Sequence, residues 1–201
     1  MTTARDLMIV AIDTPSTPPV ERGDLSLALA GAELIDLIGA ESLTLDGHHI
    51  LPGLPPPIDD RLLREAASSL VRQAPYESVE DWLWRRGRGL AAAYLAALEA
   101  EALVTRPHAR RVLRDDPPTV ADSAARRRAA DRWTSREPVL AGLAAAAGIG
   151  EQPSDDQIDE LPDDQVVTVL AAVNDAVMEL EAVRQRRAIE DAAFDNLWRG
   201  V

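Results

Sequence analysis

Hydrophobic and polar positions along most of the chain repeat with the period of an α-helix. Between residues 24 and 38, four apolar residues recur every three or four positions: Leu27, Ala30, Leu34 and Leu37. Such a stripe faces a core when the segment is helical. The pattern therefore predicts a helix over 24–38, with Gly39 as its stop.

The same helical period appears in further segments: 7–12, 59–71, 78–103, 119–133, 137–147 and 163–187. Residues with short polar side chains stand at the expected starts, because their oxygens accept hydrogen bonds from free backbone N–H groups. These starts are Thr3 with Asp6, Asp59 with Asp60, Ser78, and Thr119. The run RRGRG at 85–89 is expected to bend or interrupt its helix, and Phe194, Leu197 and Trp198 are expected to form a separate final turn.

Two short β-hairpins are expected between the helices. Residues 43–52 alternate apolar and polar around Asp46-Gly47, a strong hairpin signal. Residues 98–116 repeat this order weakly, as a helix end, a strand, a turn and a second strand. We therefore expect a mainly α protein: one helical domain over residues 1–201, arranged around a buried helix at 137–147, with one or two short hairpins.

The amino-acid composition limits the kinds of site and the cellular location that we expect for this protein. The 201 residues carry a formal charge of −13, and all 21 basic residues are Arg. Much Arg and Ala and no Lys suggest a GC-rich, bacterial genome. Without cysteine, disulfides, thiolate metal sites and cysteine nucleophiles are excluded. The sequence shows no signal peptide and no apolar run long enough for a membrane span, so we expect a cytoplasmic protein.

No catalytic constellation is present, so we expect a non-enzymatic protein without cofactor or metal. The pair His48-His49 would point to opposite faces of a strand, with one ring outward, which does not suit one metal ion. The acidic run at 154–164 lacks the glycine and the acid spacing of a calcium loop.

Three clusters of arginine stand out from this acidic background. They are Arg85, Arg86 and Arg88; Arg106, Arg110, Arg111 and Arg114 with His108; and Arg126, Arg127 and Arg128. Taken separately, each is an ordinary solvated face that pairs with nearby acids. If two of them converged, they could bind a phosphate or an anionic membrane.

A helix followed by a hairpin also suggests a winged-helix DNA binder. The segment 24–38 argues against it, because its polar positions include Glu33 and Asp36, whereas a recognition helix needs basic and polar groups. The total charge of −13 argues against nucleic acid as well.

The order of these segments resembles the Golgi phosphoprotein 3 family, including its actinobacterial members. Five stretches carry the resemblance: RDLMIVAID, LALAGAELIDLIGAESLTLDG, ESVEDWLWRRGRG, LEAEALVT and ADRWTSREPVLAGLAAAAG. No single motif is specific, but their order and spacing extend over about 150 residues of the printed sequence. The resemblance implies a mostly helical domain with a hairpin.

The resemblance also implies a function. Eukaryotic members recognise phosphatidylinositol 4-phosphate at the Golgi membrane and capture glycosyltransferase tails. Their headgroup pocket uses a Trp and three Arg, whose matching positions here are Glu21, Ala30, Arg88 and Ala91. Arg88 therefore keeps the family's residue type, and we name Arg22, Arg85 and Arg86 with it as candidate ligands of an anionic headgroup.

Two functions remain open from the sequence. The first is a peripheral membrane protein whose partner is an anionic phospholipid headgroup or membrane surface. The alternative is a soluble protein-interaction or regulatory module that kept the fold and lost lipid binding.

Overall fold

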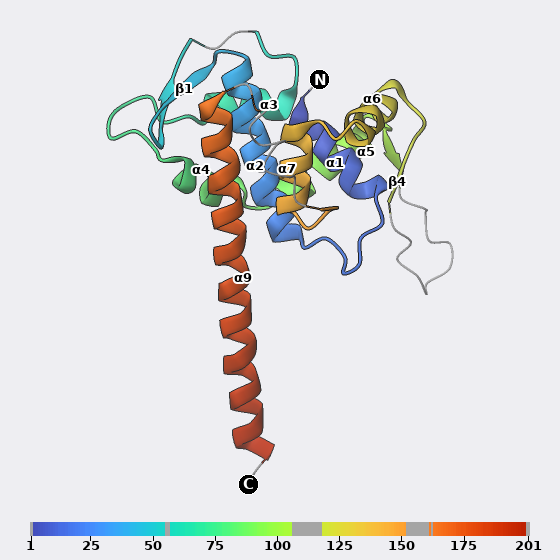
Figure 1. Cartoon of the computed structure of the whole chain (residues 1–201), viewed down its shortest axis with the longest axis vertical. Helices are drawn as coiled ribbons and strands as arrows, with labels where there is room; N and C mark the ends of the chain where they lie inside the picture. The colour runs from blue at the N-terminus through green and yellow to red at the C-terminus, as the bar shows by residue number, and fades with distance from the viewer. Residues whose placement is uncertain (1, 55–56, 106–117, 152–160, 162, 200–201) are drawn as a thin grey trace.

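Helices form most of the structure, as the sequence predicts. The computed structural model describes residues 2–54, 57–105, 118–151, 161 and 163–199 (Figure 1). Helix α2 (Arg22–Gly39) runs through the centre. It contacts the surrounding helices α1 (Thr3–Asp13), α3 (Arg61–Ser68), α4 (Val79–Arg86), α5 (Leu90–Ala100), α7 (Pro138–Ala146) and α9 (Asp164–Arg199). We call this assembly the helical body.

Helix α2 is buried on more sides than its predicted stripe implies. Besides Leu27, Ala30, Leu34 and Leu37, small residues on its other faces are buried, since neighbouring helices cover them. We expected helix α7 to be buried all round, and only Pro138, Ala141 and Ala145 of it are half-exposed. Both α2 and α7 are therefore largely buried within the helical body.

Gly31 sets how closely α2 and α9 approach. A Cβ atom built on Gly31 would lie 2.3 Å from Cγ2 of Val173 on α9. Because Val has a stiff χ1 angle, it cannot easily move aside. We expect Gly31→Ala to lower the free energy of unfolding by about 1–3 kcal/mol, the usual cost of overpacking. Urea denaturation measures this.

Gly39→Ala is the matched control, because a Cβ there would meet no atom within 4 Å. Alanine favours helix, so this variant should be neutral or more stable by up to about 1 kcal/mol. Equal losses in both variants would contradict close packing at Gly31.

The first predicted hairpin is confirmed. Strands β1 (Leu43–Asp46) and β2 (His49–Pro52) pair antiparallel, with Asp46 opposite His49. Gly47 in the turn has φ +58°, a left-handed conformation that glycine adopts without strain. His48 and His49 are both exposed, so the expectation of one outward ring was wrong, because His48 lies in the turn.

The second hairpin differs from its prediction. Strand β3 (Val104–Thr105) pairs with β4 (Thr119–Val120), so its return strand lies beyond residue 116. Thr119 is therefore a strand residue and not a helix cap. Ser123 caps α6 (Ala124–Thr134) instead, because its Oγ accepts a hydrogen bond from the Arg126 N–H at 3.1 Å. Arg106, Arg110, Arg111, Arg114 and His108 lie outside the described residues, as does most of the acidic run 154–164.

The break predicted at 85–89 is confirmed. Helix α4 is capped by Ser78 as expected and ends at Arg86. Helix α5 starts after Gly89, whose φ is +72°. It ends at Ala100 and not near 103, since Ala102 turns the chain with φ +57°.

Thr2, and not Thr3, caps α1: its hydroxyl accepts from the Arg5 N–H at 3.3 Å. Asp6 is buried and forms ion pairs with Arg128 and Arg132 of α6. The prediction that Thr3 and Asp6 form the cap was wrong, because α1 already includes Thr3 and because the side chains of Thr3 and Asp6 are buried against the rest of the fold.

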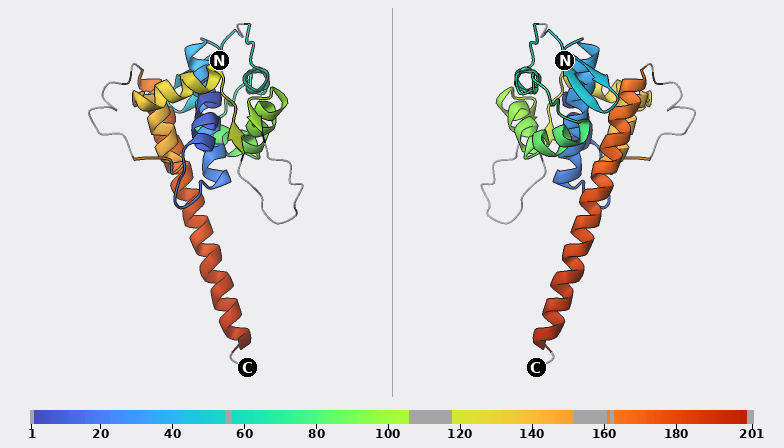
Figure 2. Two further views of the ribbon diagram at one scale, coloured as in Figure 1. Left: turned by 90° about the vertical axis from the view of Figure 1, so that its right-hand side faces the viewer. Right: turned by 90° about the vertical axis from the view of Figure 1, so that its left-hand side faces the viewer.

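Helix α9 continues to Arg199, so the separate final turn expected around Phe194 is part of one long helix. Its second half extends away from the helical body (Figures 1 and 2). Every residue from 185 to 191 is exposed. We call residues 185–199 the arm. Within the described parts of the chain, no helix is both long and apolar enough to cross a membrane.

Candidate functional site

The guanidinium of Arg86 forms its hydrogen bonds inside the helical body. Its Nε and Nη2 donate to Glu33 of α2 at 2.7 and 2.8 Å, and Nη2 also donates to the Leu62 carbonyl at 3.1 Å. The Tyr94 hydroxyl donates to the same carboxylate at 3.0 Å. Glu33 is fully buried. This candidate ligand therefore neutralises a buried acid.

The titration of this cluster follows from its burial. Burial raises the pKa of Glu33, although the hydrogen bonds from Arg86 and Tyr94 work in the opposite direction. Burial and the neighbouring Glu33 charge both raise the pKa of Tyr94. Desolvation of Arg86 favours its neutral form, but its hydrogen bonds to Glu33 and the nearby negative charges, that of Glu33 first, together outweigh this and raise its pKa.

Arg85 is also paired, but at the surface. Its Nε and Nη2 donate to the two carboxylate oxygens of Glu77 at 2.6 and 2.7 Å. Its guanidinium lies 5.0 Å from the centre of the Trp82 ring, a cation–π distance. The hydrogen bond to Glu77 raises the pKa of Arg85. A phosphate would have to compete with Glu77 for this side chain.

Arg88 and Arg22 are exposed, and neither forms an ion pair with another described residue. Arg88 lies in the link between α4 and α5, beside the first turns of α2. Ser26 fixes this link, because its Oγ accepts from the Ala91 N–H at 3.1 Å. Arg22 opens α2 one helical turn before Ser26. Both cations therefore belong to the end of the body where α2 begins.

The four candidate arginines thus do not form one concave site. Arg22 and Arg88 flank the start of α2, whereas Arg85 and Arg86 are held by Glu77 and Glu33. Of the other positions matched to the eukaryotic pocket, Ala30 is buried and its carbonyl accepts from the Trp82 indole at 3.2 Å. The methyl group of Ala30 therefore makes no contact at the surface.

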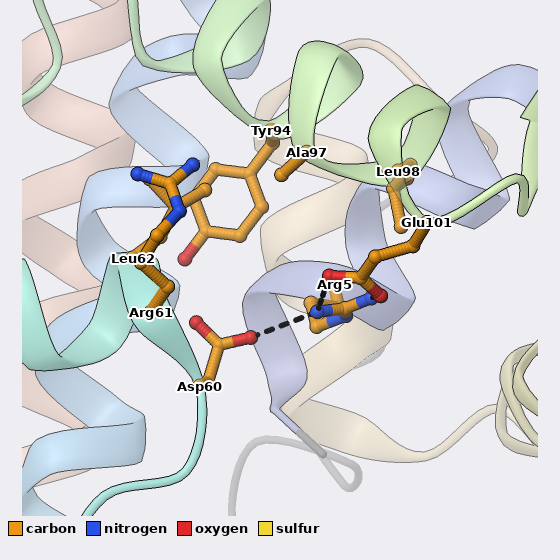
Figure 3. A pocket seen from close by; sticks show the side chains of 8 residues that line it. All are labelled: Arg5, Asp60, Arg61, Leu62, Tyr94, Ala97, Leu98 and Glu101. Atoms are coloured by element: carbon orange, nitrogen blue, oxygen red, sulfur yellow. Dashed lines mark hydrogen bonds and ion pairs between the residues drawn. The ribbon is translucent and has the colours of Figure 1, made fainter.

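An ionic cluster that sequence reasoning missed lies around Arg5 (Figure 3). Arg5 of α1 donates to Asp60 at 3.0 Å and to Glu101 at 2.9 Å, with a further short contact to Glu101. The hydrogen bond to Glu101 is the main cause that raises the pKa of Arg5. The adjoining cavity of about 20 Å³ has room for about one water molecule. The position of Arg5 just before the apolar run of α1 was the signal that the sequence offered.

Asp36 is a half-buried acid with a structural role. Its carboxylate accepts from the backbone N–H groups of Thr3 and Ala4 at 2.8 and 3.1 Å, and so caps α1 from α2. Burial raises the pKa of Asp36 to about 6, while these two hydrogen bonds act in the opposite direction. The anchoring of α1 therefore involves a group that titrates in mildly acidic solution.

Larger hollows in the surface are lined by acids. One of about 410 Å³ lies along α9 and contains Glu80, Asp175 and Glu179. Another of about 550 Å³ adjoins the start of α1 and contains Asp36, Asp59 and Asp60. Carboxylates repel an anionic headgroup, so neither hollow suits a phosphate. Among the described residues, no three His, Asp or Glu side chains are grouped to hold a metal ion.

A sequence model of the Golgi phosphoprotein 3 (GPP34) family matches residues 4–189. The chain belongs to this family. The match covers α1 from Ala4 onward, α2 to α7, and α9 as far as Ile189 in the arm. A search among curated proteins finds no match.

Proposed function

We propose that this Golgi phosphoprotein 3-like protein is a peripheral protein that binds anionic phospholipid headgroups through Arg88 and Arg22. The observation that carries the proposal is the exposure of both cations at the start of α2, without ion-pair partners among the described residues. Family membership supports the same ligand class.

The site would be a surface contact and not a deep pocket. Trp84 is half-buried and lies about one turn before Arg88, and indole rings favour the interface between lipid and water. The exposed guanidinium groups could each contact a phosphate oxygen by charge-assisted hydrogen bonds. Such contacts weaken as salt concentration rises.

Vesicle co-sedimentation with matched variants tests this contact. An arginine near an anionic membrane contributes about 1 kcal/mol, so Arg88→Ala should weaken binding about fivefold and Arg22→Ala with Arg88→Ala about thirtyfold. Arg127→Ala is the control, since it removes the same charge from α6, far from the start of α2 in Figure 1. Equal losses in Arg88→Ala and Arg127→Ala would show nonspecific attraction and contradict the proposed site.

A protein-interaction module without lipid binding is the second candidate. It is favoured by the use of Arg85 and Arg86 within the fold, where Glu77 and Glu33 occupy two of the four candidate arginines. This function predicts that vesicles of any headgroup leave the protein in the supernatant.

A further inference from the structure

The outward face of α9 carries a regular stripe. Its members alternate at spacings of four and three residues, and all are exposed: Ala171, Asp175, Met178, Ala182, Gln185 and Ile189. The opposite face of the helix, with Val166, Val169 and Val173, packs into the helical body. A four-three spacing is the pattern by which one helix packs along another in a coiled coil.

We propose that the occupant of this stripe is α9 of a second copy of the chain, packed antiparallel in a two-fold symmetric dimer. Met178 and Ile189 are 71% and 69% exposed, and they are the large apolar residues of the stripe. With the symmetry axis between Val183 and Arg184, Met178 lies opposite Ile189 of the second copy. Two-fold symmetry forms this contact twice.

Charge complementarity supports the same register. Glu179 and Arg186 each follow a stripe residue, so both flank the contact on the same side. In the register centred between Val183 and Arg184, residue 188 of the second copy is level with Glu179. Arg186 of that copy lies two residues, about 3 Å, along the axis from this point, within reach of the Glu179 carboxylate. Neither residue forms an ion pair with another described residue of its own chain. Opposite charges at flanking positions select partner and orientation in coiled coils.

The hollow of about 410 Å³ gives the second arm a place to lie. It is lined by Thr168, Ala171, Asp175 and other residues of α9, and by Ser78 to Glu80 at the start of α4. In the proposed register, the end of the second copy's arm extends along Ala171 and Asp175.

Sedimentation equilibrium of the full chain tests the dimer. The unmodified protein should be dimeric at micromolar concentration, and Ile189→Asp should be monomeric. Glu179→Arg or Arg186→Glu alone should weaken the dimer about tenfold, since each change replaces two attractions by two repulsions. The double variant should restore the affinity. Arg187→Glu is the control, because residue 187 points away from the stripe. A monomeric unmodified protein, or a dimer that these changes leave intact, would overturn the proposal.

Crosslinking separates this arrangement from other self-associations, because the chain has no cysteine of its own. Mixing Met178→Cys with Ile189→Cys protein should give a disulfide-linked heterodimer. Met178→Cys alone should not crosslink, since in the antiparallel register its two copies lie about 16 Å apart along the axis, beyond disulfide reach. Efficient Met178 self-crosslinking would indicate a parallel pair and refute the antiparallel dimer.

Discussion

Replacing Arg86 by Ala is expected to lower the free energy of unfolding by about 3–5 kcal/mol, the typical result of removing one partner from a buried ion pair. Glu33 would remain fully buried, with the Tyr94 hydroxyl as its remaining described side-chain donor. Because folded domains are stable by only about 5–15 kcal/mol, this single change would remove a large fraction of the total. Chemical denaturation measures the loss.

The pH dependence of the stability loss in Arg86→Ala shows whether the buried charge of Glu33 causes it. In Arg86→Ala the pKa of the buried Glu33 rises further, because the opposing guanidinium is gone. A carboxyl whose folded-state pKa is raised destabilises the fold as pH increases above its unfolded value. The deficit of the variant should therefore shrink in acid. Arg61→Ala is the control, since its pair with Glu65 is 62% and 49% exposed and is worth about 0.3–0.5 kcal/mol. A loss in Arg86→Ala no larger than in Arg61→Ala would contradict the buried role.

Asp36 is expected to make stability depend on mildly acidic pH. Its pKa is about 6 in the folded protein, against an ordinary value of 3.8, so the folded state binds the proton more tightly. This rise in the pKa of Asp36 corresponds to about 3 kcal/mol. The contribution of Asp36 is therefore most favourable below pH 4 and is lost as pH rises to about 6.

Asp36→Asn removes this titration while keeping an oxygen that can accept from the start of α1. The stability of the variant relative to the unmodified protein should increase by about 3 kcal/mol between pH 4 and pH 7. Urea denaturation at a series of pH values measures the difference. A difference that is constant with pH would mean that Asp36 is not the titrating group.

Local features of the fold could be predicted from the sequence because their causes are local. Asp46-Gly47 specifies a tight turn wherever it occurs between two alternating strands, and Ser78 caps α4 with its own side chain. The interruption at 85–89 follows from glycine, which stops one helix and allows the left-handed start of the next. These predictions needed no knowledge of distant residues.

The ion pairs of the candidate site could not be predicted in the same way. Arg86 has the same side chain as Arg88, yet it ends beside Glu33, 53 residues earlier in the chain. Which of them stays free depends on how α4 packs against α2, and sequence spacing does not contain that information. The cap of α1 by Asp36, 33 residues away, was missed for the same reason. Sequence patterns located the cations, and tertiary packing decided which of them are available.

The proposed function requires that the exposed arginines at the start of α2 bring the protein to anionic lipid. Co-sedimentation of the unmodified protein with vesicles of phosphatidylcholine alone, or with added phosphatidylserine or phosphatidylinositol 4-phosphate, tests it most directly. We expect the protein to pellet with both anionic mixtures at low salt, to stay in solution with neutral vesicles, and to be released as salt increases. Failure to pellet with either anionic mixture at low salt, or equal pelleting with neutral vesicles, would contradict the claim.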